Sequence, residues 1–192
     1  MSAHKILLAA RSCFAKEGYE GASLQKIAEE VGIKKPSIYA HYKGKEDLFL
    51  HVMKLVFATE KRRIIDYYIR NQQVRFELRM NHFFHWMLQE YELNDNARFL
   101  IRMGYYPPAG LYDQVMDILI PFLDGLRRAL TRLLERERMA GGVSCKDPRE
   151  AALAFLTIVE GALMELVCGR RDRYLGRVEA VWPIYWQGMN TQ

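Results

Sequence analysis

Cysteine is scarce in this chain of 192 residues, which contains only Cys13, Cys145 and Cys168. Their odd number, their wide separation and the absence of a C-x-x-C pair argue against a disulfide framework and against a zinc ribbon. We therefore expect reduced thiols and a cytoplasmic protein. The first residues agree, because His4 and Lys5 precede a short amphipathic pattern where an export signal would carry an apolar core.

Long hydrophobic runs are also missing. Residues 151–169, AALAFLTIVEGALMELVCG, come closest to the length of a membrane span, but they include Glu160 and Glu165. A charged side chain at the centre of a bilayer costs roughly 2.5 to 3.5 kcal/mol. We expect a buried helix of a bundle here, and no membrane partner.

Familiar catalytic motifs do not occur. The sequence has no G-x-S-x-G elbow, no phosphate-binding glycine loop, no H-E-x-x-H and no convincing pair of carboxylates. His82 and His85 lie three residues apart and could share a helix face, but no third metal ligand stands at a suitable spacing. We predict no catalytic residue, no metal ion and no cofactor, and we do not expect an enzyme.

Strand patterns are absent as well, since no run shows period-two alternation bounded by turn residues. Apolar residues instead recur at helical spacing along nearly the whole chain. The sequence predicts an all-α fold of about nine or ten helices.

Three short helices are expected near the N-terminus. The first two apolar stripes end at Gly18 and Gly32, and Ser23 stands where the second helix would have its N-cap. The third helix is expected from about Lys35 to Tyr42, with Pro36 in its first turn, where a missing N–H costs nothing.

Longer helices are expected downstream. Their ranges are 48–68, 76–91, 97–106 and 111–138, then a helix opened by Asp147 and Pro148, and a last helix capped by Asp172. Pro121 should kink or split the helix at 111–138, because its ring removes one backbone hydrogen bond. Pro183 lies inside the last helix, where it either bends or ends that helix.

Positive charge is concentrated in one short segment of a chain with net charge +5 and a pI near 9.1. Residues 31–45 contain four lysines and no carboxylate. The second and third helices, joined by a turn at Gly32 and packed on the first, would form a helix-turn-helix whose last helix enters the major groove of DNA. The alternative is an ordinary solvated face, and the neighbouring two-helix pattern favours DNA.

Seven of the candidate DNA-binding side chains lie in or beside this third helix. Lysines at both of its ends can meet phosphates, and the hydroxyl and imidazole groups between them can reach base edges or backbone oxygens. Lys45 also begins the next helix, where unpaired N–H groups and the helix dipole suit a phosphate. The seven are Lys34, Lys35, Ser37, Tyr39, His41, Tyr42 and Lys45.

The stretch GYEGASLQKIAEEVGIKKPSIYAHYKGKEDLF, residues 18–49, resembles the TetR family of bacterial transcriptional repressors. The residues that carry this resemblance are the glycine-aromatic pair at 18–19, Ile27-Ala28, Val31-Gly32-Ile33, Tyr39, His41-Tyr42, Lys45, Glu46 and Leu48. Ala22 replaces a common hydroxyl residue, and Lys34 and Pro36 stand where Ser and then Gly are frequent. These departures concern the operator sequence and some phosphate contacts.

The resemblance implies roles for individual residues. Ser23 and Lys45 would hold phosphates, and Lys35 and Ser37 would approach bases. Tyr39, His41 and Tyr42 would contact or brace the DNA backbone. It also implies a DNA-binding domain at 1–46 and a helical ligand-binding and dimerisation domain at 47–192.

The second domain is rich in aromatic residues, as expected of an apolar cavity that stacks flat ligands, although a solid aromatic core would have the same composition. Glu160 stands among apolar residues, where it would bind a cationic compound, pair with an arginine such as Arg102, or reach solvent at the edge of a dimer. The candidate ligand-binding residues are Phe57, Phe83, Trp86, Phe99, Met103, Tyr106, Phe122, Glu160 and Met164.

The resulting hypothesis is a ligand-responsive repressor. A homodimer, formed through the last two helices, would bind double-stranded operator DNA and be released by a small apolar or cationic aromatic effector. By analogy, such a sensor would control an efflux gene. Three alternatives are a fatty-acyl or other metabolite as ligand, a regulator without a small-molecule ligand, and a non-specific architectural DNA binder.

Overall fold

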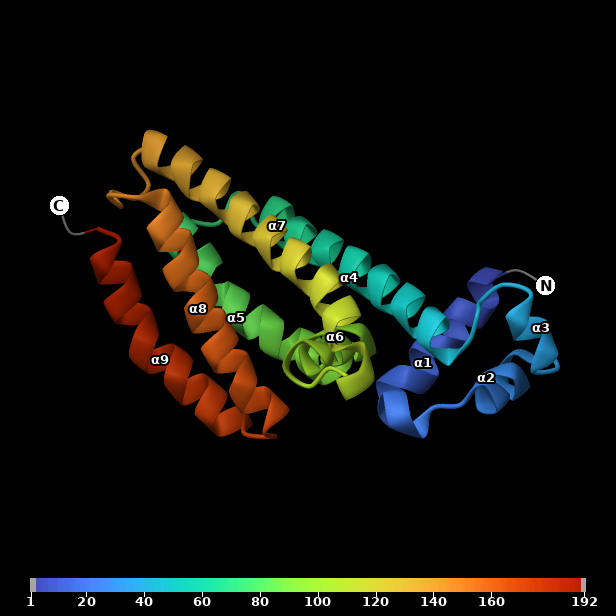
Figure 1. Cartoon of the computed structure of the whole chain (residues 1–192). Helices are drawn as coiled ribbons and strands as arrows, with labels where there is room; N and C mark the ends of the chain where they lie inside the picture. Colours follow the sequence, from blue (N-terminus) through green and yellow to red (C-terminus); the bar gives the residue numbers. More distant parts are fainter. Residues whose placement is uncertain (1–2, 191–192) are drawn as a thin grey trace. The chain divides into compact units, whose positions relative to one another are not determined.

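The computed structural model describes residues 3–190, and within that range every regular element is a helix (Figure 1). The elements are α1 (Ala3–Gly21), α2 (Leu24–Val31), α3 (Pro36–Tyr39), α4 (Lys45–Arg70), α5 (Phe76–Leu93), α6 (Asp95–Tyr105), the 3-10 helix η1 (Ala109–Leu111), α7 (Tyr112–Met139), α8 (Pro148–Val167) and α9 (Arg171–Gly188). The predicted all-α fold is confirmed.

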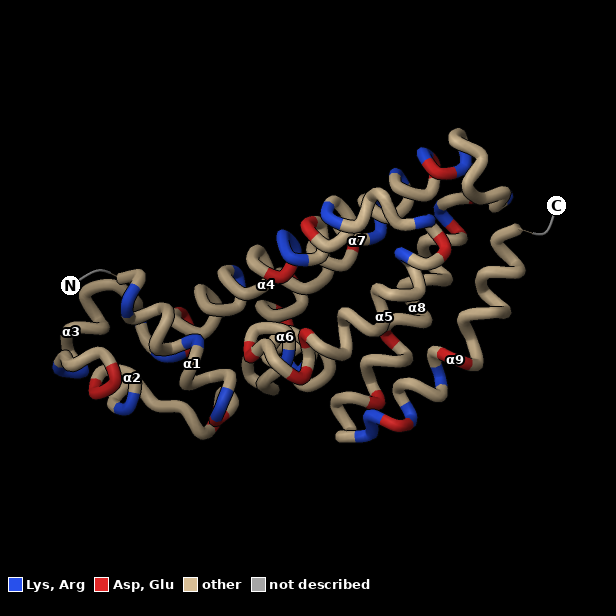
Figure 2. The backbone as a smooth tube through the Cα atoms, turned by 180° about the vertical axis from the view of Figure 1, so that it is seen from behind, with Lys and Arg blue, Asp and Glu red and all other residues tan. Residues whose placement is uncertain are grey.

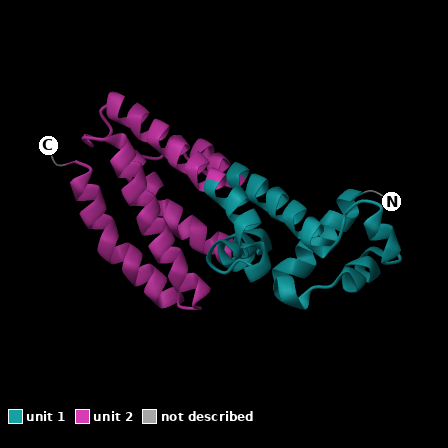
Figure 3. Cartoon of the chain, in the orientation of Figure 1, with its two compact units in different colours: residues 1–62, 92–120 teal, residues 63–91, 121–192 magenta. Residues whose placement is uncertain are grey.

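The chain forms two compact units (Figure 3). Unit 1 contains residues 1–62 and 92–120, and unit 2 contains residues 63–91 and 121–192. The helices α4 and α7 each contribute residues to both units. The division after residue 46 separates the expected DNA-binding domain from the expected ligand-binding domain, and it stays a prediction.

Unit 1 begins with the helices expected from the sequence. The Ser23 hydroxyl oxygen accepts a hydrogen bond from the Lys26 N–H at 3.2 Å, which caps α2. Gly32 ends α2 in the left-handed conformation, with φ of 74°. Gly18 breaks the helical geometry of α1, with φ of 73° and ψ of 179°. Both glycines therefore interrupt the helical backbone at the positions where the sequence predicted helix ends.

Aromatic rings join three helices of unit 1. The ring of Phe49 in α4 lies 5.1 Å from Phe14, 4.9 Å from Tyr19 and 5.9 Å from Phe99, measured between centroids. Phe14 and Tyr19 belong to α1, and Phe99 belongs to α6. Edge-to-face pairs of this kind stabilise beyond the area that they bury. The helix α1, on which the helix-turn-helix packs, is thus in contact with both α4 and α6.

Unit 2 has a core shared by α5, α8 and α9, in which α8 and α9 lie side by side (Figure 1). Buried tyrosines fasten this core to backbone carbonyls. The Tyr174 hydroxyl donates to the Phe84 carbonyl at 2.7 Å, and the Tyr185 hydroxyl donates to the Ala151 carbonyl at 3.0 Å. Burial raises the pKa of both phenols, so each stays protonated and remains a donor.

Two boundaries differ from the prediction. α3 ends at Tyr39, before Tyr42, because the N–H groups of His41 and Tyr42 both bond to the Ile38 carbonyl and the regular ladder stops there. Asp172 does not cap α9. The Tyr174 N–H bonds to the carbonyl of Arg170 at 3.0 Å, which makes Arg170 the N-cap residue and places Asp172 in the first turn.

Both interior prolines are accommodated within helices. α7 runs from Tyr112 to Met139 as one helix, so the expected split at Pro121 does not occur. Leu119 and Phe122, on either side of this proline, are both buried. Pro183 lies inside α9 and does not end it. Among residues 3–190, no helix combines the length and the apolar character that crossing a bilayer requires.

Candidate nucleic-acid interface

The segment around α3 presents polar side chains above a buried anchor. Ile38 is fully buried, whereas the side chains at positions 34, 35, 37, 39 and 41 are exposed. Pro36 fills the first helical position, where its missing N–H costs nothing. Five predicted DNA-binding residues therefore lie on the accessible side of a short helix.

The segment at residues 31–45 is positively charged and contains no acidic residue. The nearest carboxylates in the sequence are Glu30, near the end of α2, and Glu46 and Asp47, in the first turn of α4. Asp47 Oδ2 accepts a hydrogen bond from the Lys43 N–H at 2.8 Å, which fixes the turn between α3 and α4. Figure 2 marks the basic and acidic positions along α2, α3 and α4. The lysines on both sides of α3 suit a polyanion such as the DNA backbone.

Lys45 is held in place by α1. Its ammonium nitrogen lies 4.4 Å from the centroid of the Tyr19 ring and 3.5 Å from the Glu20 carbonyl oxygen. The same residue begins α4, whose first N–H groups point away from the helix. Lys45 therefore adds a positioned cation to the positive end of a helix dipole, as a phosphate contact requires.

Ser23 keeps a donor after capping α2. Its oxygen accepts from the Lys26 N–H, which leaves the hydroxyl hydrogen for another acceptor such as a phosphate oxygen. Lys26 itself pairs with Glu17 at 2.6 Å and links α2 to α1.

Tyr42 differs from its neighbours because it is buried, with only 6% of its surface exposed. Its hydroxyl donates to the Ala3 carbonyl at 3.0 Å, and its ring meets His51 edge-on at 5.3 Å. Burial raises the pKa of this phenol, which keeps the donor intact. In the free chain Tyr42 secures the end of the helix-turn-helix to α1, and its contact with DNA stays a prediction.

The candidate ligand-binding residues are divided between the two units. In unit 1, Phe57, Phe99 and Met103 are buried, whereas Tyr106 is 57% exposed. Phe99 packs on Phe49 at the base of the helix-turn-helix. This group includes buried apolar residues near the DNA-binding helices and one exposed aromatic ring.

In unit 2, Phe83 and Trp86 stack at 5.4 Å and form part of a packed aromatic cluster with Tyr67 and Tyr68. Phe122 is buried in α7. Glu160 and Met164 lie one turn apart on α8 and are exposed in the single chain. The structure brings Phe83 and Trp86 together, and their use as ligand contacts stays a prediction.

Glu160 is exposed in the single chain, and the roles expected for it stay predictions. Nearby groups still desolvate its carboxyl enough to raise its pKa. Glu165 is buried instead, and its oxygens lie 2.9 Å from Arg173 Nε and 2.5 Å from Arg177 Nη2. Sequence reasoning missed this pairing, because the turn between α8 and α9 sets its geometry.

Metal binding gains no support from the geometry. Within the described part of the chain, no group of three or more His, Cys, Asp or Glu residues is arranged to hold a metal ion.

Residues 6–52 match the sequence profile of the bacterial regulatory proteins of the tetR family. The HTH-type transcriptional repressor AcnR of Corynebacterium diphtheriae is 46% identical over 50 residues, which are 26% of each chain. IcaR of Staphylococcus epidermidis, an HTH-type negative transcriptional regulator of the biofilm operon icaADBC, is 32% identical over 74 residues, or 38% of each chain. The matched segment thus spans only about a quarter to two fifths of these curated relatives.

Whole-chain similarity is found among solved structures. The regulatory protein TetR from Rhodobacter sphaeroides superposes with a TM-score of 0.76, covering 95% of this chain and 97% of that one, at 19% sequence identity. Identity at this level shows a shared fold and leaves the ligand open. Residues 6–52 therefore match the N-terminal region of the bacterial regulatory proteins of the tetR family, and the whole chain shares the fold of a solved member of that family.

Proposed function

We propose that this protein is a transcriptional repressor that binds operator DNA as a homodimer and releases it when a small effector binds. One observation carries the proposal. The exposed face of α3, flanked by lysines and anchored by the fully buried Ile38, lies within the residues that match the family profile. The family comprises transcriptional regulators and not enzymes, and we propose no catalytic activity.

Contacts with DNA are proposed in two classes. Lys34, Lys43 and Lys45 would neutralise phosphates, which gives affinity and a fixed register on the duplex. Lys35 and Ser37 would face base edges from the exposed side of α3. Ser23, Tyr39 and His41 would add backbone contacts.

The homodimer is proposed to form through α8 and α9. Leu153 and Ile184 are exposed by 57% and 72%, and Met164 by 39%. Ala154 and Ala180 are small exposed residues of the same two helices and would let helices of a second copy approach closely. A two-fold dimer would present its two α3 helices to half-sites about one helical turn, or ~34 Å, apart.

The effector is proposed to be an apolar or cationic aromatic compound. The cluster of Tyr67, Tyr68, Phe83 and Trp86 offers ring faces on which flat ligands stack. To release DNA, the effector must bind the DNA-incompetent state more tightly, because equal affinity for both states shifts nothing. The helix α4 supports such coupling, because it begins at Lys45 beside the helix-turn-helix and continues into unit 2. An efflux gene would be a target suited to this effector class.

Fluorescence anisotropy with duplex DNA from upstream of the protein's own gene tests the proposal. A specific repressor should prefer this site over random duplex by about 10³-fold or more at matched salt. The variant Lys35→Ala should lose most of this preference. Lys43→Ala should weaken binding to both duplexes alike, and it should lower the slope of log affinity against log salt concentration by about one. Equal affinity of the wild type for both duplexes would refute a specific repressor.

The effector is tested in the same assay. Release of the bound duplex by a panel of aromatic cations and neutral aromatics is expected, and fatty-acyl compounds form the comparison set. If no compound of the first group releases DNA while a fatty-acyl compound does, the proposed effector class is wrong and the DNA-binding function stands.

A further inference from the structure

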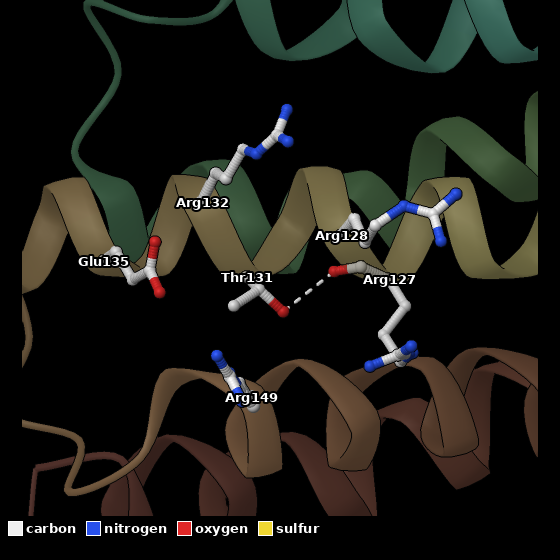
Figure 4. Close-up of a pocket in the computed structure, with 6 residues that line it drawn as sticks. All are labelled: Arg127, Arg128, Thr131, Arg132, Glu135 and Arg149. Atoms are coloured by element: carbon white, nitrogen blue, oxygen red, sulfur yellow. Dashed lines mark hydrogen bonds between the residues drawn. The ribbon is translucent and has the colours of Figure 1, made fainter.

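A cleft lined by arginines lies between α7 and the start of α8. Four arginines, one threonine and one glutamate line a space of about 270 Å³ (Figure 4). The formal charge of the lining is therefore +3. We call it the arginine cleft, and its residues are Arg127, Arg128, Thr131, Arg132, Glu135 and Arg149.

Two arginines face each other across the cleft. Figure 4 shows Arg127 extending from α7 toward α8, and Arg149 extending from α8 toward α7. The side chain of Thr131 lies in the same space, and Arg128 and Arg132 leave α7 on another side. Glu135 completes the lining on α7. Arg127 and Arg149 therefore form the inner pair of cations, and Arg128 and Arg132 add positive charge at the rim.

The hydrogen-bond donors available to a ligand come from the guanidinium groups. The Thr131 hydroxyl donates to the Arg127 carbonyl at 2.9 Å, so its hydrogen is already committed. Arg149 occupies the first turn of α8, and Asp147 accepts its backbone N–H at 2.7 Å. The positive end of this helix dipole adds to the local potential.

The arginines of the cleft lack strong internal partners. Across residues 3–190, no carboxylate lies within ion-pair distance of Arg128, Arg132 or Arg149. Arg127 has an exposed contact with Asp124 at 3.3 Å, a geometry that contributes little in water.

Arginines elsewhere in unit 2 are paired more closely. Arg79 and Arg177 lie 2.5 Å from the carboxylates of Glu137 and Glu165, respectively. The unit therefore pairs arginines where they hold helices together, and leaves those of the cleft available to an external anion.

We propose that the arginine cleft binds a phosphorylated small molecule through two neighbouring phosphate groups. Guanidinium groups match phosphate oxygens with two parallel hydrogen bonds, and two facing arginines suit a diphosphate. The cleft is polar and charged, unlike the aromatic cluster proposed for the effector, so the two sites would bind different chemistry. The inference holds whether or not the protein is a repressor.

Isothermal titration of the full-length protein with inorganic pyrophosphate, at constant ionic strength, tests the site. The double variant Arg127→Gln/Arg149→Gln should weaken binding by about tenfold or more, since each lost charged hydrogen bond carries a factor of roughly ten. The control Arg70→Gln/Arg170→Gln removes the same charge from exposed positions outside the cleft and should bind as the wild type does. Circular dichroism and the thermal midpoint establish that both variants are folded.

Glu135→Gln provides a test in the opposite direction. Removing the one carboxylate of the cleft should tighten pyrophosphate binding several-fold, because it opposes the anion electrostatically. The proposal is overturned if the wild type does not bind pyrophosphate in the millimolar range or below, or if neither cleft variant changes its affinity. It is also overturned if only a random DNA duplex, and not pyrophosphate, loses affinity in the double variant, because the cleft would then contact nucleic acid.

Discussion

Glu165 is a single residue on which the junction of α8 and α9 depends. Its carboxylate is buried at the end of α8 and pairs with Arg173 and Arg177 in α9, whose side chains are each about half exposed. Removal of the negative charge leaves two cations that water can still reach. The loss in free energy of unfolding is therefore that of charged hydrogen bonds, and no unpaired ion remains buried.

We expect Glu165→Gln to lower the free energy of unfolding by about 1.5 to 3 kcal/mol. Urea denaturation followed by circular dichroism measures this change. Glu179→Gln on the exposed side of α9 is the matched control and should change stability by less than about 0.5 kcal/mol. Equal effects of the two substitutions would contradict a stabilising role for Glu165.

Tyr67 makes stability depend on pH in the alkaline range. Its hydroxyl donates to the Arg79 carbonyl at 2.8 Å, and burial raises the pKa of this phenol from 10.0 to about 12. Because the pKa is higher in the folded chain, the protonated form is favoured by folding. Its contribution is fully present below pH 10 and is lost between pH 10 and pH 12.

The stability of the wild type should therefore fall faster than that of Tyr67→Phe as the pH rises from 10 to 12. Two pKa units correspond to about 2.7 kcal/mol, which is the upper limit of the difference. Urea midpoints of both proteins across this range, with tyrosinate absorbance as a check on ionisation, measure it. Parallel pH profiles would mean that Tyr67 titrates normally.

At the scale of elements, local chemistry predicted several helix ends. Ser23 and Gly32 bound α2 as expected, and Asp147 caps α8 by accepting the Arg149 N–H. These signals act within four residues of the chain, so they can be read without the fold. Asp172 resembled the same signal, but the N-cap residue of α9 is Arg170, two residues earlier, and Asp172 lies in the first turn.

Gly32 allows a test of its backbone role alone. An added Cβ would meet nothing within 4 Å, so any cost of Gly32→Ala comes from its left-handed φ of 74°. We expect a loss of about 1 to 2 kcal/mol in unfolding free energy. Gly44→Ala, which also meets nothing within 4 Å and has no positive φ, is the control. Similar losses for both variants would exclude the backbone explanation.

Parts of the candidate site that depend on distant residues escaped prediction. The exposed lysines beside α3 followed from a cationic segment without carboxylates. The burial of Tyr42 did not, because its partner Ala3 lies 39 residues away in sequence. The arginine cleft escaped as well, since Arg149 meets the arginines of α7 only after the chain reverses through the loop before α8.

At the scale of the whole molecule, the proposed function requires two copies of the chain. Each copy has one α3, and a single short helix binds one DNA half-site with low affinity. Dimerisation makes the second half-site contact intramolecular, which raises the overall affinity by about 10² to 10⁴. The exposed apolar residues of α8 and α9 should therefore control DNA binding although they do not touch DNA.

The double variant Leu153→Glu/Ile184→Glu should sediment as a monomer, whereas we expect the wild type to sediment as a dimer. Four carboxylates would then meet in the proposed interface of two copies, and like charges there cost several kcal/mol. Affinity for the duplex from upstream of the gene should fall by about 10²-fold or more. Ile69→Glu/Leu93→Glu places the same charges at exposed apolar positions outside α8 and α9, and should remain dimeric. A dimeric Leu153→Glu/Ile184→Glu protein with normal affinity would move the interface to another surface, whereas a monomeric protein with normal affinity would separate DNA binding from dimerisation.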